Sequence, residues 1–565
     1  MPCVAPRSSP VTRVFVAPLL TLTALAAFLV IVCTDHAAAQ SFTSKSSTIA
    51  TVSTYHNDKQ RTGQNLLETT LNTSNVNSTQ FGKLFSQKVD GYIYSQPLYV
   101  PSLTIGGATH NVVFVTTMND SVYAFDADSN TGANASPLWK VNFLGSGITT
   151  VPSSAVDCTG TITTQIGIMG TPVIDTTTGV MYVVARTEES GSYYQKLHAL
   201  NITTGAEMYG GPVTIAASVI GTGTGSSGGM LAFNPLIQNQ RSALLFQNSQ
   251  VYIAWGSHCD KSTYHGWLMA YGYKTLDQKA AWVTTPDGDE GAIWDAGSGP
   301  AGDTSNNIFL AIANGTFDVN TGGTDYAQSL VKLAPPSGGT FAVSDYFTPY
   351  NGPSLDMGDW DIGSGGIMLL PSQTKSPVQQ LAVQGNKSGD IYVVNRQNMG
   401  HYNSENNNQI VQYLPGADKG QWNSPAWWNE NVYFGGSDDT LKAFALDTTT
   451  GLLSTTPTST TTHKFGYPGT TPSISANQAK DGVLWALDNS SYKTSTGAVL
   501  YAYDATNLAT ELYASSQNST RDDPGGAVKF QVPTVANGKV YVATQTQLSV
   551  FGLLTTAKRE GKKSK

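Results

Sequence analysis

The stretch Asn111–Asp126 reads NVVFVTTMNDSVYAFD. It contains an apolar strand, a polar turn and a second strand with alternating apolar residues, which is the pattern of a β-hairpin. The same phrase returns at Gly179–Asn201, Val251–Gly272, Val432–Asp447 and Val483–Asp504. A phrase that recurs with constant strands and variable loops predicts a repeat architecture.

Each repeat also has strands before and after the hairpin. A short strand marked by Pro or Gly precedes it, as at Gln96–Val100, and many repeats are followed by a strand with an aromatic residue, such as Trp139 or Trp282. Two weaker copies cover residues 308–334 and 380–395. Units of four strands at this spacing are propeller blades, and each blade is buried against its neighbours. We therefore predict an all-β fold, a single β-propeller of about eight four-stranded blades.

The last repeat, Val532–Leu553, supplies only three strands. We expect Phe81–Val89 to pair with it as the missing outer strand and so close the ring, because an open edge would leave backbone groups unpaired. The expected organisation is a signal peptide at 1–39, an N-terminal arm at 40–80, the propeller at 81–554 and a basic, solvated tail at 555–565. The arm is expected on the outside of the ring or across one of its faces.

The first residues have the features of an export signal. Arg7 and Arg13 provide positive charge, Val14–Cys33 is apolar, and Ala37–Ala39 offers small residues for cleavage. We therefore expect an extracytoplasmic protein, secreted or periplasmic. An uncleaved membrane anchor is the alternative, because the apolar run is about long enough to span a bilayer. No later segment is apolar enough to cross a membrane, so we expect no other transmembrane domain.

The charge composition of the chain limits the classes of molecule that it can bind. Only 12% of residues are charged, and the formal net charge is −8, so nucleic acid is excluded as a partner class. After the predicted cleavage the remaining cysteines are Cys158 and Cys259. An isolated pair in an oxidising compartment predicts a structural disulfide between them. We expect a monomer whose ligand is a small molecule, a carbohydrate or a protein.

The turn of the repeat carries a recognisable signature. It is strongest at Tyr123–Gly132 (YAFDADSNTG), His198–Gly205 (HALNITTG) and Ala443–Gly451 (AFALDTTTG). With the preceding Pro strand and the outer Trp, it resembles the pyrroloquinoline-quinone-type propeller repeat of quinoprotein alcohol dehydrogenases and of a bacterial outer-membrane assembly lipoprotein. The resemblance covers roughly residues 81–554. It implies the propeller fold and is compatible with both cofactor-bearing enzymes and cofactor-free binding scaffolds.

The chain departs from that family in its cysteines. Quinoprotein alcohol dehydrogenases usually carry a disulfide between adjacent cysteines over the cofactor, and this chain has no such pair. The family also needs a carboxylate base near the quinone and Glu, Asn and Asp oxygens around Ca²⁺. Because the motif that would place them cannot be matched residue by residue, no catalytic residue is transferred from the resemblance.

A binding site is expected where the first strands of all blades converge. The loops before these strands line one mouth of the axial channel, and propellers commonly bind ligands there. The candidate residues in these loops are Tyr94, Gln96, Met169, Trp294, Asp295, Asp359, Trp360, Asp361, Trp422, Asn423, Tyr467 and Gln531. The ligand-binding prediction rests chiefly on the aromatic and acidic members of this set.

Two neighbouring blades carry nearly the same phrase, AIWDAGSG at Ala292–Gly299 and GDWDIGSG at Gly358–Gly365. Each places a Trp, which offers a flat stacking surface, beside an Asp, which offers an acceptor or metal ligand. The alternative is that the repeat reuses one buried Trp and one turn-capping Asp. A second cluster, His258, Cys259, Asp260 and His265, has ligand-type side chains, but a disulfide with surface polar groups explains it as well as Zn²⁺ does.

Three classes of function remain open. The first is an exported binding scaffold with an aromatic and acidic channel mouth, which requires only the repeat. The second is an oxidoreductase of alcohols or sugars that depends on pyrroloquinoline quinone and Ca²⁺, in which Trp294 or Trp360 would stack the cofactor and Asp295, Asp359 or Asp361 would serve as base or ligand. The third is a carbohydrate-active lyase or hydrolase that uses the same mouth.

The charges of the candidate mouth residues do not favour binding of pyrroloquinoline quinone. The cofactor carries three carboxylates and needs a cationic partner, and the candidate mouth residues include no Lys or Arg. The nearest basic residues in sequence are Arg186, Lys387 and Arg396. We therefore expect weak or no binding of the quinone.

Overall fold

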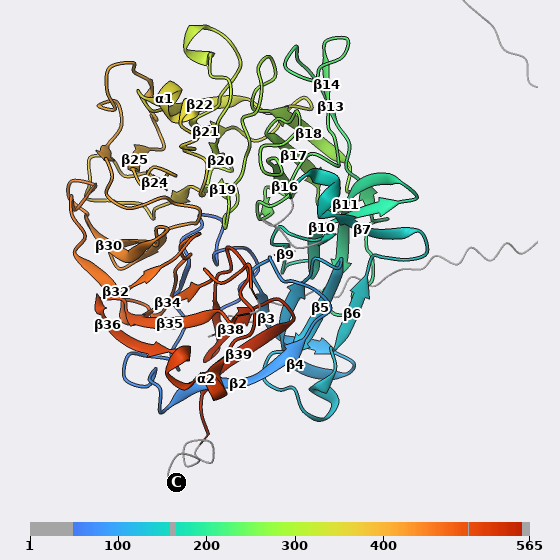
Figure 1. The fold of residues 1–565 in the computed structure, drawn as a ribbon, viewed down its shortest axis with the longest axis vertical. Coiled ribbons are helices and arrows are strands. Elements are labelled where there is room, and N and C mark those ends of the chain that lie inside the picture. The colour runs from blue at the N-terminus through green and yellow to red at the C-terminus, as the bar shows by residue number, and fades with distance from the viewer. Residues whose placement is uncertain (1–48, 159–164, 495, 556–565) are drawn as a thin grey trace, which may run out of the picture. The chain divides into compact units, whose positions relative to one another are not determined.

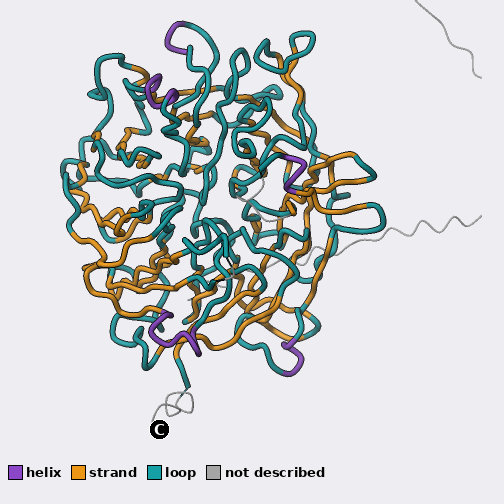
Figure 2. Tube along the Cα trace, viewed as in Figure 1, coloured by secondary structure: helices purple, strands orange, loops and turns teal. Residues whose placement is uncertain are grey.

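The computed structural model describes residues 49–158, 165–494 and 496–555. The predicted signal peptide and the basic tail from residue 556 lie outside these residues. Within them the chain is all-β, and α-helix is confined to α1 (Gly352–Met357) and α2 (Ser519–Asp522). The sheets follow one another around a common centre (Figure 1), with loops between short strands (Figure 2). The predicted propeller of eight four-stranded blades is confirmed for this part of the chain.

The first four blades follow chain order. Blade one contains β3 (Leu98–Ile105), β4 (Ala108–Thr116), β5 (Ser121–Asp126) and β6 (Trp139–Asn142). Blade two contains β9 (Val173–Asp175), β10 (Val180–Glu189), β11 (Ser192–Asn201) and β12 (Val213–Thr214), extended by β7 (Ile148–Pro152) and β8 (Gln165–Ile166). Blade three contains β15 (Leu245–Gln247), β16 (Gln250–Trp255), β17 (Trp267–Gly272) and β18 (Gln278–Val283). Blade four contains β19 (Ala301–Gly302), β20 (Ile308–Ile312), β21 (Ser329–Leu333) and β22 (Val343–Thr348), with β26 (His401–Tyr402) at its edge.

The last four blades continue the order. Blade five contains β23 (Met368–Leu369), β24 (Leu381–Gly385), β25 (Ile391–Asn395) and β27 (Gln412–Leu414). Blade six contains β28 (Ala426–Trp428), β29 (Asn431–Phe434), β30 (Asp439–Asp447) and β32 (Ser459–Phe465), with β31 (Leu452–Leu453) paired to β30. Blade seven contains β33 (Ser473–Asn477), β34 (Lys480–Asp488), β35 (Val499–Asp504) and β36 (Asn507–Ala514). Blade eight contains β37 (Thr534–Ala536), β38 (Lys539–Ala543), β39 (Gln547–Leu553) and β2 (Phe81–Lys88). A separate hairpin is formed by β13 (Ser218–Ile220) and β14 (Met230–Ala232).

The hydrophobic core lies between neighbouring blades. Tyr182 of blade two and Trp255 of blade three are both fully buried in one cluster that joins these two sheets. Every residue of β5 is buried, because a middle strand is covered by a blade on each face. This double burial explains why the middle strands read as continuous apolar runs in the sequence.

The outer strand of blade eight comes from the N-terminal side of the chain. Strand β2 pairs antiparallel with β39, with Phe81 opposite Leu553 and Lys83 opposite Phe551. The ring of Phe81 is fully buried and lies edge-on to Tyr513, 5.0 Å away between ring centroids. The strand expected at Phe81–Val89 is therefore present, and it packs against blade seven.

The described part of the N-terminal arm follows the inner strands. Backbone N–H groups of these strands donate to arm carbonyl oxygens in the pairs Ile174–Ser53, Gly302–Lys59, Leu369–Gln60, Trp427–Thr62 and Ile474–Gly63. Val52 exchanges two backbone bonds with Tyr99 of blade one, each 2.8 Å long. Strand β1 (Gln64–Asn65) pairs in parallel with β33, and Asn65 Nδ2 donates to the carbonyl of Val535 in blade eight. The arm thus lies at the inner edges of the blades and not along their outer strands.

One arm side chain contacts the strand ends of blades three and four. Arg61 is fully buried. Its Nη2 donates to the carbonyls of Pro300 at 2.8 Å and Leu244 at 3.3 Å, and its Nη1 to Thr54 Oγ1 at 2.9 Å. With this contact the arm reaches all eight blades, so it is part of the propeller core. No helix among the described residues is long and apolar enough to cross a membrane.

Candidate functional site

A cavity of about 330 Å³ lies among the loops that precede the inner strands of blades three to eight. Arg241 precedes β15, Trp294 precedes β19, Asp361 precedes β23, Trp422 precedes β28, and Phe530 precedes β37. We call this the central cavity. Its volume lies at the lower end of the range typical of small-molecule sites.

One arm residue lines a smaller hollow that shares two residues with the central cavity. This hollow of about 20 Å³ shares Arg241 and Phe530 with the central cavity and is lined by Tyr55 of the arm, with Tyr94 and Met169. The hydroxyl of Tyr55 donates to the carbonyl of Gly297. The arm therefore contributes to the wall of this smaller hollow.

One wall of the central cavity is cationic, and we call Arg241 and Lys529 the cationic wall. The guanidinium carbon of Arg241 lies 3.7 Å from the ring centroid of Phe530. The ammonium nitrogen of Lys529 lies 4.7, 4.9 and 5.2 Å from the ring centroids of Tyr492, Tyr467 and Phe530. Within residues 49–158, 165–494 and 496–555, no hydrogen bond or ion pair joins either side-chain cation to a protein group. These contacts with aromatic faces are cation–π interactions.

Burial disfavours both charges of the cationic wall. It lowers the pKa of Arg241 to about 10. It also lowers the pKa of Lys529 to about 7, assisted by repulsion from Arg241 and Lys493. An anion bound between these two cations would relieve both effects, because it supplies the counter-charge that the protein does not.

Two carboxylates, those of Asp260 and Asp361, also line the central cavity, and we call these residues the acidic wall. Lys387 neutralises one of these acids: its Nζ lies 3.2 Å from Asp361 Oδ2 and 2.6 Å from Asp359 Oδ1. Burial raises the pKa of Asp361 although Lys387 opposes the shift. Asp260 Oδ1 accepts a hydrogen bond of 2.8 Å from the hydroxyl of Tyr264. The lining of the central cavity therefore holds two cations without a carboxylate partner in the described part of the chain and two carboxylates, one of which is paired with Lys387.

The candidate mouth residues taken from the sequence include no Lys or Arg, but three basic side chains are present in the cavity. Arg241, Lys387 and Lys529 all line the central cavity. Arg241 and Lys529 lie in the loops directly before β15 and β37, so the rule that selected the other candidates could have found them. Two of the basic residues close to the candidates in sequence, Arg186 and Arg396, do not line the central cavity. Arg186 contacts His258 and the carbonyl of Leu236, and Arg396 lines a separate hollow next to the arm.

The two similar phrases place different members in the central cavity. Trp294 lines it, while Asp295 is fully buried in the wall and accepts a 3.3 Å hydrogen bond from Ser242 Oγ. In the other blade Asp361 lines the cavity, while Trp360 is 47% exposed outside it. Asp295 has a positive φ of 38°, so the chain is not extended at this pair, and the two side chains have different surroundings. Burial raises the pKa of Asp295 to about 7.

The remaining candidates divide into lining and wall residues. Trp422 and Tyr467 line the central cavity, with their rings edge-on at 5.1 Å. Three buried amides hold the wall instead, and neither cavity includes them. Gln96 Oε1 accepts from the backbone N–H of His56, Asn423 Nδ2 donates to the carbonyl of Gly435, and Gln531 Nε2 donates to the carbonyl of Ile93. Asp359 lies at the surface and pairs with Lys387.

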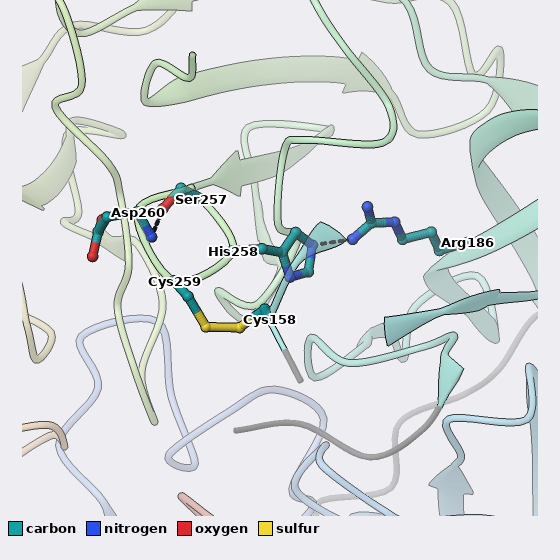
Figure 3. The surroundings of a disulfide bond; sticks show 6 residues. All are labelled: Cys158, Arg186, Ser257, His258, Cys259 and Asp260. Carbon is teal, nitrogen blue, oxygen red and sulfur yellow. Dashed lines mark hydrogen bonds between the residues drawn. A yellow bond between two sulfur atoms is a disulfide. The ribbon is translucent and has the colours of Figure 1, made fainter. Parts of the chain in front are cut away.

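A disulfide joins Cys158 to Cys259, as predicted, and both cysteines line the central cavity. Figure 3 shows it beside His258, whose ring faces Arg186. Burial lowers the pKa of His258 well below its usual range. Because Asp260 follows Cys259 directly, the disulfide anchors the loop that carries part of the acidic wall.

The alternative of a Zn²⁺ site at this loop does not fit. Cys259 is committed to the disulfide, and His265 contacts Thr285 Oγ1 at 2.9 Å and the carbonyl of Thr224 at 2.8 Å. In the part of the chain that the structure describes, no group of three or more His, Cys, Asp or Glu side chains could hold a metal ion. The loop is therefore a structural part of the cavity wall.

This chain is similar in structure to several proteins of known structure. No family model matches the chain, and no curated protein matches it. Among solved structures, a europium-containing methanol dehydrogenase matches with a TM-score of 0.58 at 13% identity, covering 89% of this chain and 98% of that chain. The quinohemoprotein alcohol dehydrogenase from Comamonas testosteroni matches with a TM-score of 0.57 at 14% identity, covering 89% and 80%.

A third structure is quinohemoprotein alcohol dehydrogenase ADHIIG from Pseudomonas putida HK5, with a TM-score of 0.55 at 14% identity over 89% of this chain and 80% of that chain. Likeness at such low identity extends to the fold and not to the chemistry of a site. The repeat signature of the sequence and these neighbours agree on one architecture. The chain has the β-propeller fold shared with the quinoprotein alcohol and methanol dehydrogenases.

Proposed function

We propose that this propeller binds a planar organic anion in its central cavity. The single observation that carries the proposal is the cationic wall, where Arg241 and Lys529 lie in a cavity without an acidic partner among the described residues. A buried charge without a partner is costly, so two such cations in one cavity favour a carboxylate-bearing ligand.

The aromatic lining defines the shape of the ligand. Trp294, Trp422, Tyr467 and Phe530 line the same cavity as the cations. Flat aromatic faces bind flat rings by stacking, and stacking adds to the binding free energy that comes from burial of apolar surface. The lining therefore favours a flat ring whose carboxylates face Arg241 and Lys529.

A second candidate is the quinone-dependent oxidoreductase. Pyrroloquinoline quinone is flat and carries three carboxylates, so the cationic wall and the aromatic rings fit it. Among the described residues no group of three or more His, Cys, Asp or Glu side chains could hold a metal ion, so the Ca²⁺ that the family resemblance implies has no carboxylate-rich set of ligands there. We therefore derive no oxidation step, and the quinone enters here only as one flat polycarboxylate that the central cavity could bind.

Three small probes with a six-membered ring separate the effect of ligand shape from that of ligand charge. Benzene-1,3,5-tricarboxylate is flat and anionic, cyclohexane-1,3,5-tricarboxylate is anionic but not flat, and benzene-1,3,5-tricarboxamide is flat but uncharged. Quenching of tryptophan fluorescence should show binding of the first probe, at least about tenfold tighter than either control. Equal affinity for all three, or no binding of the first, would contradict the proposal. Pyrroloquinoline quinone with Ca²⁺ and a dye-linked alcohol assay tests the second candidate.

The proposed site of action is outside the cytoplasm. The disulfide Cys158–Cys259 is of the kind that persists in oxidising compartments, and residues 1–39 have the composition of an export signal. Protein binding at the mouth, the scaffold form of the same proposal, would use the exposed Trp360 beside it. Fractionation of the native host with antibody against the mature chain tests the location.

A further inference from the structure

Lys529 has an environment that differs from that of Lys387, the other lysine of the central cavity. It is 6% exposed, and its ammonium nitrogen lies within 5.2 Å of three aromatic ring centroids. Lys387, by contrast, is held by Asp359 and Asp361. A lysine without a carboxylate partner, beside another cation and among aromatic rings, is the arrangement that makes an amine a nucleophile.

We infer that Lys529 forms an imine with an oxo acid bound in the central cavity, with the carboxylate of that acid on Arg241. Both residues contact Phe530, with Arg241 Cζ 3.7 Å and Lys529 Nζ 5.2 Å from the same ring centroid. A short aromatic oxo acid, with its carbonyl carbon next to the carboxylate, can therefore address both groups while its ring meets the aromatic lining. The inference rests on the proposed function and names the ligand class.

The pKa values of Lys529 and Arg241 support formation of the imine. Burial, Arg241 and Lys493 together lower the pKa of Lys529 to about 7, so the neutral amine is abundant at neutral pH. Arg241 keeps its charge, because its pKa of about 10 lies well above neutrality. One residue can thus hold the carboxylate while the other attacks.

The step balances without a further reagent. The lone pair of the Lys529 amine attacks the carbonyl carbon, a C–N bond forms, and the carbonyl π electrons move to oxygen. The resulting carbinolamine loses its oxygen as water, which carries both protons of the original amine. The products are an imine and one water molecule, and no electron is gained or lost.

Borohydride trapping tests the inference on the full mature chain. The probe is benzoylformate, a flat aromatic 2-oxo acid, and benzoate is the control that lacks the carbonyl. After reduction, peptide mass mapping should find the secondary-amine adduct on Lys529 at a yield at least about tenfold above any other lysine. Benzoate should give no adduct. Lys529→Arg keeps the charge but not the nucleophile and should lose the adduct, whereas Lys493→Arg, a neighbouring exposed lysine, should keep it.

The outcomes separate the inference from the proposed function. Fluorescence titration with benzene-1,3,5-tricarboxylate is run on the same preparations, and a thermal melt of Lys529→Arg reports whether this variant is folded. If the tricarboxylate binds and no Lys529 adduct forms, the imine is overturned and the anion site stands. If lysines label evenly, the imine is also overturned. If neither binding nor an adduct is found, both proposals fall.

Discussion

The guanidinium of Arg241 lies over the ring of Phe530, with 3.7 Å between Cζ and the ring centroid. The two residues belong to loops before β15 and β37, in blades three and eight, and the same ring is approached by Lys529. Stacking on an aromatic face restricts a guanidinium while leaving its N–H groups free to donate. The contact with Phe530 therefore holds the guanidinium of Arg241 in place, with its N–H groups able to donate to a bound carboxylate.

Anion binding should depend on pH through Lys529. Its pKa of about 7 reflects burial and the two neighbouring cations, and a bound carboxylate favours the charged form. Affinity for benzene-1,3,5-tricarboxylate should therefore fall as pH rises from 7 to 9, approaching about tenfold per pH unit. Isothermal titration at several pH values measures it. Lys529→Arg should give a flat profile, and a flat profile for the unmodified protein would contradict the role of Lys529.

Arg61 should be a major determinant of stability. Replacing it with Met leaves the buried carbonyls of Pro300 and Leu244 without their donor, so the free energy of unfolding should fall by at least about 3 kcal/mol. Lys59→Met is the matched control, because Lys59 makes one bond to the carbonyl of Asp303 and is only partly buried. Its effect should be about 1 kcal/mol or less. Chemical denaturation followed by fluorescence compares the two variants.

Loss of the disulfide should destabilise the fold and loosen the cavity wall. The bond closes a loop with a sequence separation of 101 residues. In the chain-entropy model a loop of that order contributes roughly 2–5 kcal/mol. Cys158→Ser with Cys259→Ser should lower the melting temperature and make it insensitive to dithiothreitol. Equal melting of the oxidised and reduced protein, or free thiols in non-reducing peptide maps, would contradict this assignment.

Asp295 should make stability fall as pH rises. Burial raises its folded-state pKa to about 7, above the value of an unfolded carboxyl, so between these values the folded chain holds a proton that the unfolded chain has lost. Its contribution is present at low pH and is lost as pH rises through 7. Asp295→Asn should therefore gain roughly 2–4 kcal/mol at pH 8 and little at pH 4.

Asp447→Asn is the control for this measurement. Hydrogen bonds from Thr449 lower the pKa of the exposed Asp447, which gives the opposite sign. This variant should therefore not gain stability at pH 8. Thermal melts of both variants at pH 4 and pH 8 test the pair, and a gain for Asp295→Asn that is independent of pH would rule out the titration.

Much of the fold could be predicted because the repeat is local. Asn111–Asp126 forms β4 and β5 with its polar turn between them, and the Pro-marked Gln96–Val100 leads into β3. Hydrophobic alternation and turn residues are read from neighbouring positions in the chain. The path of the arm could not be read in this way. Its contacts, such as that of Arg61 with Pro300, join positions far apart in sequence through backbone carbonyls, which no side-chain pattern records.

The candidate site was predictable in its place and less so in its members. Trp294, Asp361 and Trp422 lie in the central cavity, as the position before an inner strand suggests. Asp295 turns into the wall, because the direction of each side chain depends on local backbone dihedrals and not on residue type. The aromatic and acidic residues of these loops do not indicate the cationic wall, although Lys529 stands two positions before Gln531.

Calorimetric titration of benzene-1,3,5-tricarboxylate into the mature protein and into Arg241→Met tests the central claim most directly. Met keeps much of the side-chain volume over Phe530 and removes the free donors, so the fold should survive, as a melt of the variant checks. The account predicts binding by the unmodified protein that weakens at least about tenfold in Arg241→Met. Equal affinity in the two proteins, or no heat of binding in either, would contradict it.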